Sequence, residues 1–173
     1  MQRPRANMAI MEQGTSRARL ERDARERLVP LRRQLGVTTF GMNEIVLQPG
    51  QRGRIHRHER QEEVYLVLEG SLALLVEGEE IVLGQGELIR VAPSLRRQLV
   101  NRGPQRLVVL ALGGDGEHNG RDGEAFASWE DDSGVAPQDL PLPEDLPLPE
   151  DLPQPEDLPL PEDLPLPEDL PSP

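Results

Sequence analysis

The stretch GQRGRIHRHERQEEVYLVLEG, residues 50–70, decides the fold and contains most of the candidate site. It places His56 and His58 one residue apart, in a chain that has three histidines, and Glu63 follows after four further residues. Residues two apart on a β-strand point to the same side, so the two imidazoles can converge on one point. A strand that returns from a short turn can bring the Glu63 carboxylate to the same point. Two histidines and one carboxylate form the facial ligand set that non-haem Fe(II) favours and that Mn, Ni or Zn can also use.

Short apolar or alternating segments occupy the chain between residues 36 and 113. Each is bounded by turn residues: TTFGMNEIVL, EEVYLVLEG, SLALLVEG, EEIVLG, ELIRVAP, RRQLVN and RLVVLAL. Closely spaced short strands of this kind predict an all-β sandwich or barrel. At residues 76–80 the sequence VEGEE predicts a tight hairpin, with Gly78 at the positive-φ position. Because the chain has one Trp, one Tyr and two Phe, we expect an interior of Val, Leu and Ile.

Residues 50–70 resemble the first motif of the cupin superfamily at every defining position and gap. Those positions are Gly50, His56, His58, Glu63 and Gly70. The resemblance extends over roughly residues 37–112 and implies a small double-sheet jelly roll whose ligand lies inside the barrel mouth. Since cupins often pair through edge strands or sheet packing, the resemblance also suggests a homodimer.

The second cupin motif has its frame in GELIRVAPSLRRQLVN, residues 86–101. When this segment is aligned on Pro93 and Asn101, Arg97 takes the position of the last metal-binding histidine. Arginine is always charged and has no acceptor, so it cannot ligate a cation and would repel one held nearby. A strand register shifted by one residue would turn Arg96 inward instead of Arg97. Either register replaces the histidine with an arginine.

Three interpretations of this residue set compete. In the first, Arg97 pairs with Glu63, and the histidines are hydrogen-bonded bystanders in a structural barrel. In the second, which the sequence favours, Arg97 offers a bidentate fork to a small anionic molecule, a carboxylate or phosphate. There His56, His58 and Tyr65 complete the pocket, and no metal is tightly bound. In the third, His56, His58 and Glu63 hold a divalent metal (Fe, Mn, Ni or Zn) while Arg97 positions an anionic substrate, as in an oxygenase or isomerase. Only the third interpretation makes the protein an enzyme, and the sequence does not decide among the three.

The charge distribution and composition argue against several partners. Residues 1–35 carry nine Arg and four acids, residues 36–136 ten Arg and sixteen acids, and residues 137–173 eleven acids and no base. An acidic centre and tail argue against nucleic acid, because phosphate binding needs a basic stripe on the folded face. The chain contains no cysteine, which leaves His and carboxylate as metal ligands. No apolar run is long enough to cross a bilayer and no signal peptide is evident, so we expect a cytoplasmic protein without membrane contact.

The chain before residue 114 divides into an arm and a domain. Residues 1–35 are interpreted as a basic helical arm, because the segment from Ser16 to Leu35 is rich in helix formers and has leucines at roughly helical spacing. Pro30 is expected to break or kink this helix. Residues 36–113 are assigned to the cupin barrel.

The chain after residue 113 is read as two further segments. Residues 114–136 form a Gly-rich polar segment, expected to be loop-like and to pack on the barrel through Phe126 and Trp129. His118, the third histidine, is assigned to a surface loop in this segment. Residues 137–173 hold thirteen of the eighteen prolines in hexapeptide repeats of the EDLPLP type. Proline at this density, with repelling acid pairs, predicts a disordered, extended, solubilising tail.

Overall fold

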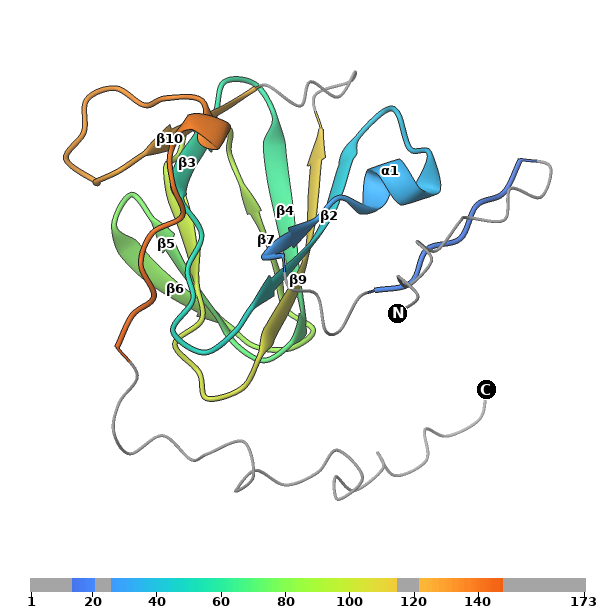
Figure 1. Ribbon diagram of the computed structural model, residues 1–173, viewed down its shortest axis with the longest axis horizontal. Coiled ribbons are helices and arrows are strands. Elements are labelled where there is room, and N and C mark those ends of the chain that lie inside the picture. Colours follow the sequence, from blue (N-terminus) through green and yellow to red (C-terminus); the bar gives the residue numbers. More distant parts are fainter. Residues whose placement is uncertain (1–13, 21–25, 115–121, 148–173) are drawn as a thin grey trace, which may run out of the picture.

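The computed structural model describes residues 14–20, 26–114 and 122–147, and in them the chain folds as a jelly roll of two five-stranded antiparallel sheets (Figure 1). The predicted all-β jelly roll is thereby confirmed. The first sheet has the strand order β1 (Leu28–Val29), β2 (Gly41–Leu47), β9 (Leu107–Gly114), β4 (Glu62–Glu69) and β7 (Leu88–Val91). The second has the order β10 (Gly123–Phe126), β3 (Ile55–His58), β8 (Arg97–Val100), β5 (Leu72–Val76) and β6 (Glu79–Leu83). A short helix, α1 (Leu31–Leu35), and a 3-10 turn, η1 (Pro137–Asp139), complete the described elements.

Strand β4 shows how the sequence sets the inner face of the barrel. Its alternate residues Glu63, Tyr65 and Val67 are buried, and the residues between them are exposed or half-buried. On the neighbouring β9 the paired residues are small or aliphatic, from Val109 to Gly113. The core is aliphatic apart from one tyrosine, as expected, and draws on both sheets: Leu47, Tyr65, Val67, Leu72, Leu74, Leu83, Val91, Leu99, Leu107, Val109 and Ala111.

The hairpin between β5 and β6 has the predicted turn. Val76 pairs with Glu79, and the two residues between them are Glu77, with φ 50°, and Gly78, with φ 86°. A two-residue turn with positive φ at both positions matches the twist of the flanking strands. The glycine supplies the second of these positions at no steric cost.

The helix predicted from Ser16 to Leu35 is wrong for most of its described length. Residues 14–20 are not helical, and Leu28 and Val29 form β1, which pairs with β2. Only residues 31–35 are helical, and Gly36 ends that helix with φ 70°. Two causes account for the difference. Pro30 interrupts the helix, and the open edge of β2 offers backbone partners that local helix propensity does not foresee. Residues 1–13 and 21–25 of the predicted arm lie outside the described residues.

The segment expected to be loop-like, residues 114–136, contains strand β10. This strand pairs with β3, with Gly123 opposite His58. Phe126 is 2% exposed, and the guanidinium groups of Arg96 and Arg57 lie 4.1 Å and 5.3 Å from its ring centroid. A strand therefore covers the edge of β3, which would otherwise expose unpaired backbone groups.

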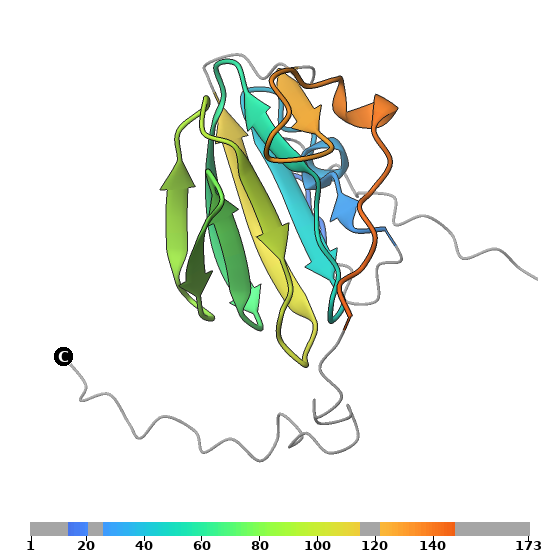
Figure 2. The same ribbon diagram turned by 90° about the vertical axis from the view of Figure 1, so that its left-hand side faces the viewer.

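The start of the predicted tail lies against the barrel. Residues 137–147 run down its side next to the chain that leads into β3, as both views show (Figures 1 and 2). The rest of the predicted disordered tail, residues 148–173, and His118 lie outside the described residues. No helix among the described residues has the length and apolar character needed to span a membrane.

Candidate functional site

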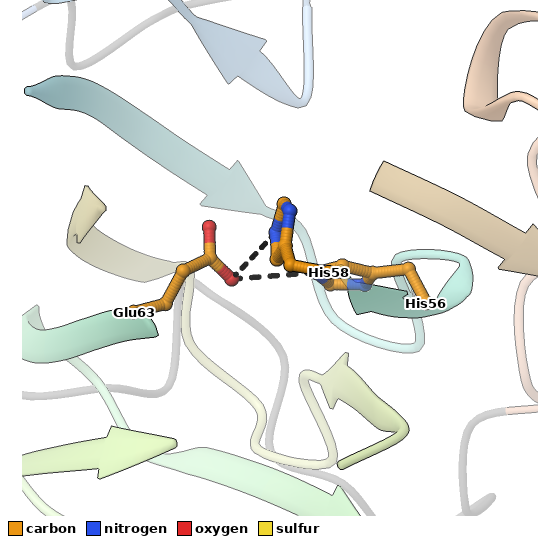
Figure 3. A group of neighbouring side chains, drawn as sticks. All are labelled: His56, His58 and Glu63. Atoms are coloured by element: carbon orange, nitrogen blue, oxygen red, sulfur yellow. Dashed lines mark hydrogen bonds and ion pairs between the residues drawn. The ribbon is translucent and has the colours of Figure 1, made fainter. Parts of the chain in front are cut away.

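The site residues converge from opposite sheets, as the spacing of the motif predicts. His56 and His58 lie on β3, and Glu63 lies on β4 after the turn that joins the two strands. Figure 3 shows both rings directed at one oxygen of the Glu63 carboxylate. The Nε2 atoms of His56 and His58 each lie 3.4 Å from Glu63 Oε2. The two imidazole rings are edge-to-face, with centroids 5.6 Å apart.

The outer ring nitrogens face acceptors. His56 Nδ1 is 3.1 Å from the carbonyl oxygen of Arg54, and His58 Nδ1 is 3.5 Å from Asp122 Oδ2. In a neutral imidazole one nitrogen donates and the other accepts, so protons on both Nδ1 atoms leave both Nε2 atoms as acceptors. Two ring lone pairs and a carboxylate oxygen then face one another. That arrangement is stable only with positive charge between them, supplied by a cation or by protons on the rings.

Asp122 is a site residue that the sequence reasoning missed. Its carboxylate accepts hydrogen bonds from the backbone N–H groups of Arg60 and Gln61, at 3.2 Å and 2.8 Å, and also approaches His58. It therefore closes the turn after the histidines and places a carboxylate beside one of the rings. No sequence signal marks it, because the aspartate is brought to the site only by the pairing of Gly123 with His58, 65 residues earlier in the chain.

Arg97 is fully buried beneath the site, and its cationic group is satisfied within the protein. It stands opposite His56 in the pairing of β8 with β3, and its side chain is 0% exposed. Nη1 donates to the carbonyl oxygens of Pro93 and Leu95, both at 2.9 Å, and Nη2 donates to Glu63 Oε2 at 3.0 Å. With the contact of Nε to the Tyr65 hydroxyl at 3.5 Å, four of the five guanidinium N–H groups are used.

Tyr65 completes the set of donors around the carboxylate. It is 1% exposed, and its hydroxyl donates a hydrogen bond to Glu63 Oε2. The same oxygen therefore accepts hydrogen bonds from Tyr65 and Arg97 inside the barrel. On the outer side it faces His56 and His58. The carboxylate stands between a buried cation and two rings that reach the surface, with side chains 22% and 14% exposed.

The ionisation of these groups follows from their contacts. Burial opposes the charge on Glu63, but His56 and His58 outweigh it and hold the pKa of the carboxyl well below its ordinary value. Burial and the neighbouring Glu63 charge raise the pKa of the Tyr65 phenol well above its ordinary value. Burial also opposes the charge on Arg97, but Tyr65 and Glu63 raise the pKa of its guanidinium. At neutral pH the site thus contains a carboxylate, a neutral phenol and a guanidinium.

The donor set fits a divalent metal ion. Ring nitrogens of His56 and His58 and a carboxylate oxygen of Glu63 all lie within 4.8 Å of one another. Imidazole and carboxylate together suit Fe, Mn, Ni and Zn. Neither ring nitrogen of His58 has a hydrogen-bond partner among the described residues, although both are buried. Arg97 weakens the attraction, because its charge lies 3.0 Å from the oxygen that would ligate the ion.

Two hollows on the described surface lie outside the barrel and contain none of the three possible ligands. One, of about 730 Å³, is on the outer face of the first sheet and is lined by residues that include Arg60, Val64 and Leu112. The other, of about 400 Å³, lies beside Phe126 and residues 140–144. Access to the site therefore runs past the partly exposed histidines rather than through either hollow.

Comparison with known proteins finds a family model that matches part of the chain. Residues 43–113 match the family model of the Cupin domain. Over 76 residues, 43% of this chain, the sequence is 34% identical to the tetracenomycin polyketide synthase protein TcmJ of Streptomyces glaucescens, and the match spans about half of that relative, 51%.

Solved structures agree with the fold. A sugar phosphate isomerase of the cupin superfamily from Silicibacter pomeroyi is 25% identical, with a TM-score of 0.51, over 58% of this chain and 65% of that chain. A cupin protein from Bacteroides fragilis is 21% identical, with a TM-score of 0.54, over 72% of this chain and the whole of that one, 100%, and it supports the fold alone.

Proposed function

We propose that residues 43–113, which match the family model of the Cupin domain, form a domain that binds a divalent metal ion and, beside it, a small anionic molecule. The proposed ligands of the metal are His56, His58 and Glu63. One observation carries the proposal: the Nε2 atoms of both rings lie 3.4 Å from the same oxygen of Glu63, so that three possible ligand atoms face one point.

Each ligand is oriented by a second contact, as metal ligands in proteins usually are. The Arg54 carbonyl contacts the outer nitrogen of the His56 ring, and the Asp122 carboxylate lies 3.5 Å from that of the His58 ring. Tyr65 and Arg97 hold the carboxylate from the inside. The chain's own residues thus fix the direction of all three donors before any ion binds. A divalent metal bound there would supply a Lewis acid to which an oxygen of the small molecule could bind.

An anionic partner is supported by chemistry and by one structural neighbour. A metal with open positions attracts carboxylate or phosphate oxygens. The neighbour from Silicibacter pomeroyi is described as a sugar phosphate isomerase, and sugar phosphates belong to this class of anions. Arg97 does not itself offer a fork to such a ligand, because its N–H groups are directed to Glu63, Tyr65 and backbone carbonyls. Arg97 instead holds the Glu63 carboxylate in place.

A metal-free anion site is the second candidate, and the ion pair of Arg97 with Glu63 favours it. Because that pair is complete without a metal, the two partly exposed histidines can carry protons on Nε2 and donate to an anion directly. The anion then takes the place of the metal, and no enzymatic step is required.

Elemental analysis distinguishes the two candidates. The full chain is purified without a metal-chelating tag, loaded with Fe, Mn, Ni or Zn, and dialysed, beside His56→Ala and His58→Ala. The proposal expects a stoichiometric metal in the wild type that both variants lose. If the wild type retains no metal and phosphate or a carboxylate still raises its melting temperature, the metal-free candidate replaces the proposal.

A further inference from the structure

The segment after η1 contacts the barrel with a three-residue period. Leu140, Pro143 and Leu146 are half-buried, whereas the residues between them are exposed. A polyproline-II helix has three residues per turn, so residues spaced by three lie on one face. The half-buried positions in residues 140–147 therefore have the spacing of one face of such a helix. Leu142, on another face, is 45% exposed.

Hydrogen bonds to its backbone groups hold this segment at both of its ends. Arg54 Nε donates to the carbonyl oxygen of Leu140 at 2.7 Å, and Arg52 Nε donates to that of Glu144 at 2.9 Å. The N–H of Leu146 donates to the carbonyl oxygen of Gly50 at 2.8 Å. A polyproline-II chain makes no hydrogen bonds of its own, so its carbonyl groups are free for such donors.

Charge complementarity adds to these contacts. Arg27 Nη2 lies 2.6 Å from Asp145 Oδ1, and Arg27 Nη1 donates to the carbonyl oxygen of Arg52 at 2.8 Å. We call the surface formed by Gly50, Arg27, Arg52 and Arg54 the tail groove. It presents three arginines to a segment of the chain in which acids are frequent and bases absent.

The docked sequence recurs further along the chain. LPLPED occupies residues 140–145 and is repeated without change at 146–151, 158–163 and 164–169. Six residues are two turns of a polyproline-II helix, so each copy can present the same leucine and proline to the groove. The copy at 152–157 reads LPQPED and the chain ends in LPSP, so the differences fall at the third position, which is Leu142 in the docked copy. The repeat varies where the docked copy is exposed.

We propose that the tail groove is a binding site for an acidic polyproline-II peptide of the sequence LPLPED, and that later copies in the same chain replace the first copy in it. In each LPLPED repeat, the groove contacts the leucine at the first position, the proline at the fourth and the acidic residue at the sixth. Placing the second copy there leaves six more residues between the groove and the bridge of Val135 to Ala125. The cost of closing a loop rises slowly with its length, so this register remains accessible.

The side chains of Arg52 and Arg54 report occupancy in the full chain. Their Nε–H groups give separate proton–nitrogen NMR signals that are shifted and protected from exchange when a carbonyl accepts from them. In the variant Leu140→Ser with Pro143→Ser, which disables the first copy alone, we expect both signals to persist, because the next copy docks. A second variant has serine at all six first-position leucines: Leu140, Leu146, Leu152, Leu158, Leu164 and Leu170. In it we expect the Nε–H groups of Arg52 and Arg54 to exchange as fast as that of the exposed Arg33.

A matched control changes the third position of every copy that does not already have serine there: Leu142, Leu148, Gln154, Leu160 and Leu166. These serine substitutions should leave both arginine signals protected, and the amide spectrum of the barrel verifies folding in every variant. Loss of both signals in the first-copy variant would overturn exchange between copies. If the control loses the protected arginine signals to the same extent, the claim that the groove contacts the first and fourth positions of the repeat, and not the third, is overturned. Signals in the first-copy variant that grow with protein concentration would mean docking from a second chain and would overturn the assignment to the same chain.

Discussion

Arg97 places a permanent cation beneath the candidate site, and its contacts show how the barrel accommodates it. The guanidinium is removed from water, yet two carbonyl oxygens, the Tyr65 hydroxyl and the Glu63 carboxylate surround it. A buried charge is tolerated only with such partners. The arginine thus neutralises the Glu63 carboxylate and fixes its direction toward the two rings.

Removing this cation is expected to destabilise the fold. Arg97→Met leaves Glu63 as a buried charge without its cation, which costs about 3–5 kcal/mol of unfolding free energy. Urea denaturation measures the loss. Arg102→Met is the matched control, because Arg102 pairs with Glu80 at the surface, with side chains 50% and 37% exposed, and such pairs contribute about 0–1 kcal/mol. Equal losses in the two variants would contradict a stabilising ion pair beneath the site.

Asp122 is expected to act on the metal through His58. Asp122→Asn can keep an amide oxygen at the position of Oδ2, which contacts both the backbone N–H of Gln61 and His58 Nδ1, but it removes the negative charge beside the ring. Partners of this kind typically change metal affinity by about 10–100-fold, so we expect weaker binding of that order. Metal titration monitored by calorimetry provides the measurement.

Asp131→Asn controls for loss of a turn. Asp131 also accepts from two backbone N–H groups, those of Ala127 and Ser128, but it contacts no residue of the site. Nitrogen chemical shifts of His58 in the metal-free protein add a second measurement, since they reveal which ring nitrogen carries the proton. A tautomer unchanged by Asp122→Asn, or an affinity that falls equally in Asp131→Asn, would show that Asp122 only closes a turn.

At the scale of elements, the turn between β4 and β5 depends on Gly70. Its φ is +79°, and a Cβ there would lie 2.6 Å from the backbone oxygen of Arg106. Gly78 has a similar φ, +86°, with open space around it. An L-residue in this conformation costs about 1–2 kcal/mol, which we expect for Gly78→Ala. Gly70→Ala should cost more, because the backbone near Arg106 must also move. Unfolding free energies from urea denaturation test the order, and a smaller loss for Gly70→Ala would contradict it.

The strands of the barrel could be predicted because their signals are local. Alternating side chains indicate β4, and turn glycines bound β5 and β6. The spacing of His56, His58 and Glu63 indicates two strands that meet after a short turn. Strands β1 and β10 could not be predicted in this way. Each forms because a distant strand, β2 or β3, offers an open edge, and pairing at long range overrides local propensity.

The same distinction applies to the site. Its three possible metal ligands follow from one motif of the sequence, and the position of Arg97 follows from a second. Asp122 does not, because its place depends on how residues 123–126 pair with β3. The start of the tail is another case: its composition predicts an extended conformation, but not that the arginines at residues 52 and 54 donate hydrogen bonds to its carbonyl oxygens.

At the scale of the whole molecule, an apolar area remains on the outer face of the first sheet. Leu88 on β7 is 64% exposed and Phe40 is 39% exposed, and half-buried Val64, Leu66 and Leu112 lie on the same face. Strand β7 is an edge of its sheet among the described residues. An exposed apolar area beside an open strand edge is typical of a surface that another protein covers.

We expect a second copy of the chain to cover this face, giving the homodimer that the sequence suggests. Leu88→Asp should weaken the dimer because it places a charge in the apolar area, while the stability of the monomer changes by roughly 0.5 kcal/mol or less, as is usual for exposed positions. Sedimentation equilibrium over a range of concentrations measures the association. Val82→Asp is the control, since Val82 is 63% exposed on β6 at the edge of the other sheet. If Val82→Asp dissociates the dimer and Leu88→Asp does not, the second sheet forms the interface, and a wild-type chain that is monomeric at all concentrations contradicts the dimer itself.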